Sequence, residues 1–273
     1  MGEKRIRNKI NAVSAASAQG PRPKDEDYVL TESLFVEDIP VQLLMLLDGM
    51  GGGEAGEEAS ELAAKYTNLF IENLIEKLHI NNREERHQFL KDAIKFAHKS
   101  VSALAEKKGE GIRCGSTLAL ILLIHNENEI TCDAAWIGDS RIYLIDNEGV
   151  SHMISKDHST TGEMVEAGYI ELWEIEDTPG HNQLTRSLGN PKEPWEGGEI
   201  ISLDEHKLWK NTEGVLICCD GVWGPLHKKE GLILTSGDKY DAKAWVDAAL
   251  AAFSTDNCSA LVARLDDLKA VID

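Results

Sequence analysis

The chain has 273 residues, of which 42% are hydrophobic, and we expect a single domain over residues 1–273. Its 28 Lys and Arg against 47 Asp and Glu give a formal net charge of −19, which disfavours nucleic acid and anionic membranes as partners. No apolar run is long enough to span a bilayer, and the N-terminus lacks the apolar segment of a secretory signal. The five cysteines form no C-x-x-C pair, so we expect a reducing compartment. We also expect the protein to be cytoplasmic and a monomer.

Short apolar segments of β character recur along the chain. Turn residues, such as those of DNEG at 146–149, separate most of them. The predicted strands cover residues 27–36, 41–48, 116–126, 129–139, 141–146, 214–220 and 259–266.

Two long helical patterns follow the second predicted strand. The first has an apolar stripe with a spacing of four, formed by Leu62, Tyr66, Phe70, Leu74 and Leu78. The second begins at Asn82, with Glu85 placed as in a capping box, and its apolar face contains Leu90, Ile94, Ala97, Val101 and Leu104. A third helix is predicted over residues 241–253. Helices inserted as blocks between strands predict an α+β fold, with antiparallel sheets flanked by helices.

A glycine-rich loop joins the second predicted strand to the first helix. Its sequence, GMGGGEAG, contains the G-x-G-x-x-G spacing of a dinucleotide-binding fingerprint. A pyrophosphate there would face Asp48 and a run of glutamates at Glu54, Glu57 and Glu58. We therefore expect the glycine beside Asp48 to allow close approach of the backbone, which offers the Gly49 carbonyl to a metal ion.

Acidic residues stand at the ends of the predicted strands. Three apolar runs end at an aspartate, and further acidic residues directly precede two other strands; the set is Asp48, Asp139, Asp220, Asp256 and the group Asp25, Glu26, Asp27. If these ends converge, the crowded carboxylates demand counter-cations. His158 and His181 are isolated and do not form a zinc set, whereas oxygen ligands select Mg²⁺ or Mn²⁺. Two such ions would bind a phosphoryl group and activate a water molecule.

The chain also resembles a known family, through eight motifs in the same order. They are GPRPKDED, LLDGMGG, GSTLAL, WIGDSRIYLI, SKDHS, LTRSLGN, CDGVWG and DNCS. Over residues 15–265 the sequence is similar to the metal-dependent protein Ser/Thr phosphatases of the protein phosphatase 2C (PPM) family, bacterial branch. The resemblance implies a central antiparallel β-sandwich between helix pairs, in four α-β-β-α layers. It also implies hydrolysis of phosphoserine and phosphothreonine on proteins, in signalling that opposes a Ser/Thr kinase.

The resemblance implies a centre of two Mn²⁺ or Mg²⁺ ions, with a weaker third. Asp48 would bridge the two ions, and hydroxide between them would attack the phosphorus. Asp220 and Asp256 would complete one ion site. Glu26 and the Gly49 carbonyl would serve the other.

Further roles follow from the same motif positions. Arg22 would bind the substrate phosphate. Asp27 and Asn257 would orient ligands or water, and Asp139 would bind the third ion. Residues 157–190 would form a mobile flap beside the site, a segment that we call the flap below.

Two departures from the family pattern affect the predicted site. Met50 stands where eukaryotic members carry a histidine proposed as general acid, so the proton for the leaving group must come from elsewhere. Gly224 replaces an acidic residue often found in that motif, which puts the third ion in doubt.

Two alternatives stay open at the level of sequence. One is a non-catalytic member of the family that binds phosphoproteins and acts as a regulator. The other is a nucleotide-binding oxidoreductase, which rests on the glycine spacing alone.

Overall fold

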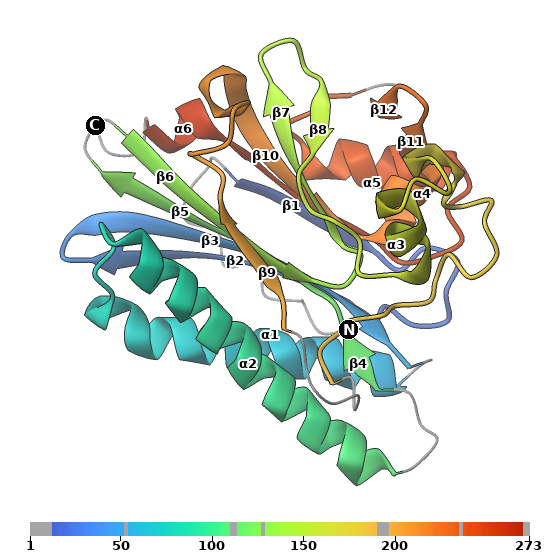
Figure 1. Ribbon diagram of the computed structural model, residues 1–273, viewed down its shortest axis with the longest axis horizontal. Coiled ribbons are helices and arrows are strands. Elements are labelled where there is room, and N and C mark those ends of the chain that lie inside the picture. Colours follow the sequence, from blue (N-terminus) through green and yellow to red (C-terminus); the bar gives the residue numbers. More distant parts are fainter. Residues whose placement is uncertain are drawn as a thin grey trace.

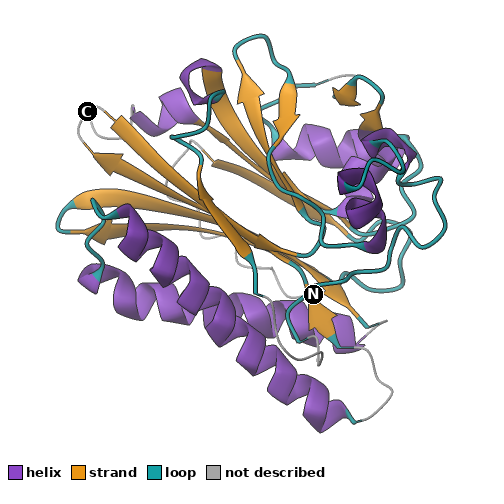
Figure 2. Ribbon diagram, viewed as in Figure 1, coloured by secondary structure: helices purple, strands orange, loops and turns teal. Residues whose placement is uncertain are grey.

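Two antiparallel sheets packed against each other form the centre of the protein, and helices cover their outer faces (Figures 1 and 2). The computed structural model describes residues 13–51, 54–109, 114–126, 129–189, 197–234 and 237–269. The first sheet has the order β2 (Asp27–Val36), β3 (Ile39–Met50), β5 (Leu118–Asn126), β6 (Glu129–Ile137) and β9 (Glu199–Ser202), and β4 (Gly115–Ser116) pairs with the end of β3. The second has the order β1 (Val13–Ala18), β13 (Cys258–Arg264), β10 (Thr212–Cys218), β7 (Arg141–Asp146), β8 (Ser151–Met153), β12 (Gly231–Leu232) and β11 (His227–Lys228). The predicted α+β fold with antiparallel sheets is confirmed.

Helix α1 (Glu54–Leu74) buries a different face from the one that its sequence pattern predicts. The first four positions of the expected stripe are only partly buried, and the fully buried stripe lies one residue later, at Ala59, Ala63, Thr67 and Ile71. The small side chains among them, Ala59 and Ala63, let the helix pack closely on β3. Tyr66 and Phe70 instead pack against the rings of Phe96 and Phe89 in α2 (Arg83–Lys108). The prediction was wrong because the periodicity was read from large apolar residues, which here fill the space between two helices.

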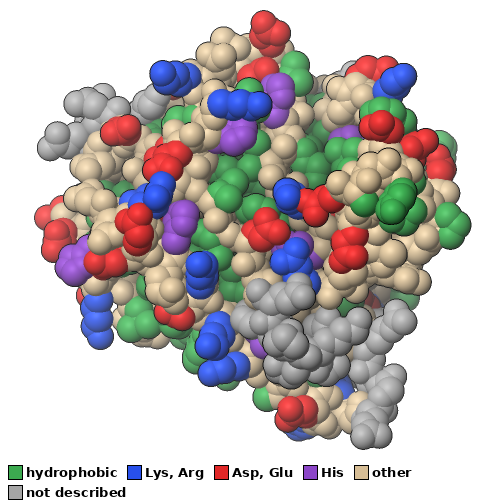
Figure 3. Space-filling model, in the orientation of Figure 1, with side chains coloured by type: hydrophobic (Ala, Val, Ile, Leu, Met, Phe, Trp, Pro, Cys, Tyr) green, Lys and Arg blue, Asp and Glu red, His purple; other side chains and the backbone are tan. Residues whose placement is uncertain are grey.

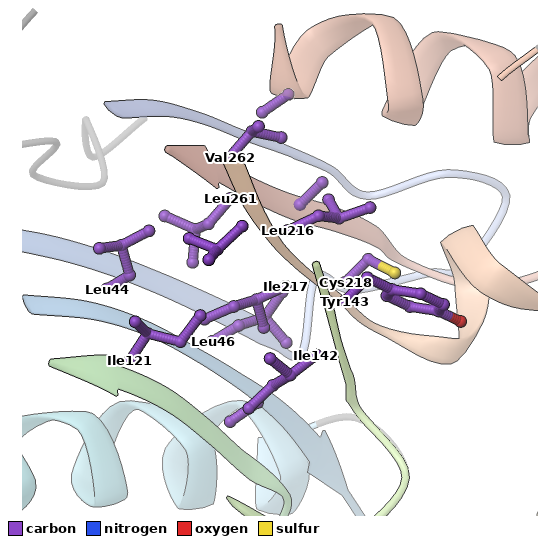
Figure 4. Packing of buried hydrophobic residues seen from close by; sticks show 14 of the residues in the cluster. Leu44, Leu46, Ile121, Ile142, Tyr143, Leu216, Ile217, Cys218, Leu261 and Val262 are labelled. Carbon is purple, nitrogen blue, oxygen red and sulfur yellow. The ribbon is translucent and has the colours of Figure 1, made fainter. Parts of the chain in front are cut away.

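Strand β3 contributes side chains to two separate cores, one on each face. Leu44 and Leu46 point toward Ile217 and Leu261 of the second sheet (Figure 4). The alternate residues Leu43, Met45 and Leu47 pack under α1 and α2. Burial on both faces explains why this strand is a continuous apolar run and does not alternate with polar residues.

The other predicted helices form where expected. The side chain of Asn82 accepts a hydrogen bond from the Glu85 amide at 3.2 Å, which caps α2, and the predicted apolar face of α2 is buried from Leu90 to Val101. Helix α5 (Ala242–Ala251) packs on the second sheet, against β13 and β1. The remaining helices are α3 (Thr160–Glu166), α4 (Asp220–Leu226), α6 (Leu265–Lys269) and the 3₁₀ turns η1 (Ile75–Lys77), η2 (Leu172–Glu174) and η3 (Trp209–Asn211).

Two surface properties bear on partners. No helix within the described residues is both long and apolar enough to cross a membrane. On the face drawn in Figure 3, basic and acidic side chains are interspersed, and the basic ones do not gather into one patch.

Candidate metal centre

Five predicted acidic residues come together at one end of the sandwich. The register of β2 and β3 sets Asp27 opposite Asp48, and the other three carboxylates follow β6 and β10 or precede β13. Burial raises the pKa of Asp48 well above its usual value, and the negative charges of Asp220, Asp27, Asp139 and Asp256 raise it further. The fold therefore converges these strand ends as the sequence predicts.

Asp48 and Asp220 lie in direct contact at the middle of this cluster. Their carboxyl groups share a hydrogen bond, and burial followed by the charge of Asp256 raises the pKa of Asp220 to about 6. Oδ1 of Asp220 is buried and has no hydrogen-bond partner among the described residues. A buried carboxylate oxygen without a donor, amid other carboxylates, fits a bound cation.

Glu26 and the Gly49 carbonyl meet over the first turn of α1. A Cβ atom on Gly56 would lie 2.2 Å from Oε2 of Glu26 and 3.0 Å from the oxygen of Gly49. The Gly49 amide donates to the Glu26 carbonyl at 3.1 Å, and a Cβ on Gly49 would lie 2.2 Å from the Gly56 carbonyl oxygen. Glycine is thus required at both positions for close approach of backbone and carboxylate.

This geometry argues against a nucleotide phosphate at the glycine-rich loop. The Glu26 carboxylate already occupies the helix start where a pyrophosphate would sit, so a nucleotide phosphate meets a negative charge there. The sheet pairings are antiparallel in the described residues, whereas the fingerprint requires a parallel βαβ unit. Gly52 and Gly53 lie outside the described residues.

Arg22 stands at the edge of the carboxylate cluster. Its Nη2 is paired with Oδ2 of Asp256, and its Nε donates to the Thr255 carbonyl at 3.2 Å. The side chain of Arg22 is 50% exposed, so part of the guanidinium remains open to a ligand. The structure therefore places a forked cation beside one predicted metal ligand.

Asn257 and Asp27 support the cluster from behind. Oδ1 of Asn257 accepts from the Glu26 amide at 2.9 Å, which fixes the residue that carries the Glu26 carboxylate. Asp27 is 2% exposed, and burial raises its pKa to about 7. Asn257 holds Glu26 in place and Asp27 lies opposite Asp48 in the sheet, which suits residues outside the ligand shell.

Asp139 reaches the cluster from the loop after β6. It is 6% exposed, and burial together with the charge of Asp220 raises its pKa well above the usual value. The loop is tied to β3 through Thr117, whose hydroxyl accepts from the Asp48 amide at 2.9 Å and contacts the Ser140 hydroxyl at 2.8 Å. The sequence prediction missed Thr117 as a support, although it lies inside the GSTLAL motif that it had identified.

A buried ion pair anchors the base of the flap. Arg141, directly after the Asp139–Ser140 loop, donates to Asp157 through Nη2 at 2.7 Å and through Nε at 3.0 Å. Its guanidinium also stacks on Trp223 of α4 at 3.4 Å from the ring centroid. The flap, α4 and the end of β6 are thus connected through one arginine. The last flap residue, Asn190, lies outside the described residues.

The ligand groups match hard cations but do not form a complete cage by themselves. Within the described residues, no three acidic, His or Cys side chains are close enough together to bind one ion as they stand. Any ion must therefore draw on the Gly49 carbonyl and on water as well, which is typical of Mg²⁺ sites.

Comparisons with known proteins agree with this geometry. The family model described as Protein phosphatase 2C matches residues 26–164. The protein phosphatase PhpP of Streptococcus pneumoniae (strain D39) is 31% identical over 197 residues, which covers 71% of this chain and 74% of that protein. A solved structure of the Mycobacterium tuberculosis serine/threonine phosphatase PstP/Ppp is 26% identical, covers 93% of this chain and 97% of that one, and has a TM-score of 0.69.

A further solved structure holds metal. It is the catalytic domain of the serine threonine protein phosphatase PstP in complex with two manganese ions, 25% identical, with a TM-score of 0.68 over 92% of this chain and 96% of that one. On the matched family model, the relatives and the fold, the chain belongs to the protein phosphatase 2C family.

Proposed function

We propose that the chain is a metal-dependent protein phosphatase that hydrolyses phosphoserine and phosphothreonine. The observation that carries this proposal is the crowding of Asp48 by four other aspartates, with Glu26 and the Gly49 carbonyl converging nearby. Such a cluster costs free energy unless cations neutralise it, and phosphoryl transfer is the chemistry that paired oxygen-bound cations serve.

The ligand roles we propose are those that the family resemblance implies. Asp48 would bridge two Mn²⁺ or Mg²⁺ ions, with Asp220 and Asp256 on one ion and Glu26 with the Gly49 carbonyl on the other. When bound, the two ions would polarise the phosphoryl oxygens and ionise a bridging water that attacks phosphorus directly. Asn257 and Asp27 keep the ligand residues in place through the contacts described above.

Arg22 would hold the substrate phosphate. Its guanidinium is half exposed and lies beside Asp256, so a phosphate that approaches the centre comes within its reach. A forked guanidinium binds two phosphate oxygens at once, which a lysine cannot do.

Met50 offers no proton to the leaving alkoxide. It lies at the end of β3, paired with Gly115. A thioether neither donates nor accepts a proton at neutral pH, so we infer that the alkoxide takes its proton from water.

The substrates we propose are phosphorylated proteins modified by a Ser/Thr kinase. The proposal treats residues 1–273 as one catalytic domain that acts as a cytoplasmic monomer, with the flap beside the site as the source of substrate selectivity. The formal net charge of −19 disfavours nucleic acid as a substrate.

The test is phosphate release from a phosphothreonine peptide. Chelator-treated protein should lose activity by at least about 100-fold, and added Mn²⁺ should restore it, because the ions supply several kcal/mol of barrier lowering. Peptide binding should be followed in parallel by fluorescence anisotropy. A protein that binds the phosphopeptide and releases no phosphate at any Mn²⁺ concentration would be the non-catalytic regulator, and the proposal would be wrong.

A further inference from the structure

A carboxylate from the flap occupies the place of a side chain that α4 lacks. If Gly224 carried a Cβ atom, that atom would lie 3.0 Å from Cδ and Oε1 of Glu176 and 3.2 Å from its Oε2. A Cβ atom at position 224 would therefore force the end of the Glu176 side chain to shift. The absence of an acidic side chain at 224 and the presence of Glu176 are thus two parts of one arrangement.

The position of Glu176 relates it directly to the metal centre. Residues 220 and 224 are one helical turn apart in α4, so side chains at these positions lie on the same face. Glu176 lies close enough to Asp220 for its negative charge to act on that carboxylate. The flap therefore supplies a carboxylate where an acidic residue at 224 would have placed one.

The neighbouring residue fixes Glu176 in this position. Ile175 is 1% exposed and belongs to the same core cluster as Val222 and Trp223 of α4. The Ile175 carbonyl also accepts from the Thr178 amide at 3.0 Å, which closes a turn around Glu176. A buried anchor directly before an exposed carboxylate holds that carboxylate toward α4.

One buried carboxylate oxygen near Glu176 lacks a donor. Oδ1 of Asp220 is buried and has no hydrogen-bond partner in the described part of the chain. Asp139 is 6% exposed and lies close enough to Asp220 for the two negative charges to act on each other. The buried cation Arg141 is committed to Asp157 through three hydrogen bonds. A buried carboxylate oxygen without a donor, beside other negative charges, fits a bound cation.

We propose that Glu176 is a flap-borne ligand for a further divalent cation, bound together with Asp220 and water, with Asp139 reached through water, in place of a side chain at position 224. The inference rests on the proposed function, because Asp220 also serves the two-ion centre. Mg²⁺ and Mn²⁺ sites of this type need only one or two carboxylates in direct contact and retain several waters. Binding of this cation connects the flap to α4, so occupancy of the site and flap position are coupled.

The experiment exchanges the carboxylate between the two positions. Mn²⁺ binding is measured by calorimetry on four chelator-treated proteins. They are the wild type, the single variants Glu176→Ala and Asp177→Asn, and a combined variant that carries both Glu176→Ala and Gly224→Asp. Glu176→Ala should weaken the weakest Mn²⁺ site by at least about tenfold, since loss of even an indirect supporting group costs that much. The combined variant should regain the site, because removing Glu176 frees the space beside residue 224. Asp177→Asn, an exposed neighbour, should match wild type.

Limited proteolysis of the flap gives a readout independent of activity. Saturating Mn²⁺ should protect the flap in wild type and in the combined variant, but not in Glu176→Ala. Identical Mn²⁺ isotherms for wild type and Glu176→Ala, with phosphate release intact, would overturn this inference and leave the proposed function standing. If the wild-type protein neither bound Mn²⁺ nor released phosphate, the proposed function itself would be wrong.

Discussion

Asp48→Asn should reduce phosphate release from a phosphothreonine peptide by at least about 1,000-fold, the upper end of the loss for one electrostatic group at an active site. The negative charges of four other aspartates act on the Asp48 carboxylate and raise its pKa, after burial. In our proposal Asp48 is the ligand shared by both ions. An amide of the same shape keeps the packing but carries no charge. The measurement is the steady-state rate at saturating Mn²⁺, with the exposed Asp92→Asn as a control that should match wild type.

The same variant distinguishes a lost metal site from a lost fold. Because burial and like charges raise the pKa of Asp48, its ionisation lowers the stability of the metal-free folded state as the pH rises through that raised pKa. Asparagine removes this cost. Metal-free Asp48→Asn should therefore melt at or above the temperature of wild type at alkaline pH, and the difference should vanish at acid pH, where the carboxyl is protonated in both states. A variant that melts lower at every pH would mean that Asp48 is structural, contrary to our account.

Asp157→Asn should lower the free energy of unfolding by about 3 to 5 kcal/mol, the usual cost of leaving one partner of a buried ion pair alone. The Arg141 side chain is completely buried, and Asp157 receives hydrogen bonds from both its Nε and its Nη2. Removal of the negative charge leaves the buried guanidinium without its charged partner, beside the neutral side chains of Trp223 and His227. Urea denaturation followed by fluorescence measures the change.

The control for this prediction is an ion pair on the surface. Lys243 and Asp247 are paired at 2.5 Å across one turn of α5, with side chains 69% and 58% exposed. Asp247→Asn should cost no more than about 0.5 kcal/mol, because solvent screens exposed pairs. Equal losses for Asp157→Asn and Asp247→Asn would show that Arg141 does not depend on its buried partner.

The strands and their acidic ends could be predicted because they leave local signals. The segment predicted over 27–36 coincides with β2, since an apolar run bounded by turn residues is a property of the sequence itself. That Asp220 would lie beside Asp48 depended instead on the pairing order of the strands. The family resemblance supplied that order, and the antiparallel sheets bring the predicted ends to one place.

Other features left no readable signal. Strand β1 was missed because VSAASA is made of small and weakly apolar residues, and it is stabilised by pairing with β13 and by packing against α5. Asp220 was assigned to a strand end, but it is the first residue of α4. Glu176 could not be connected to Gly224, because nothing in the spacing of two distant residues records that their atoms compete for one space.

The central claim is that the acidic cluster around Asp48 binds two cations. The most direct test is the anomalous scattering of manganese in crystals of the protein grown with Mn²⁺. We predict two peaks that flank the Asp48 carboxylate, one within ligand distance of Asp220 and Asp256 and the other of Glu26 and the Gly49 carbonyl. Saturating Mn²⁺ with no peak beside Asp48 would contradict the account.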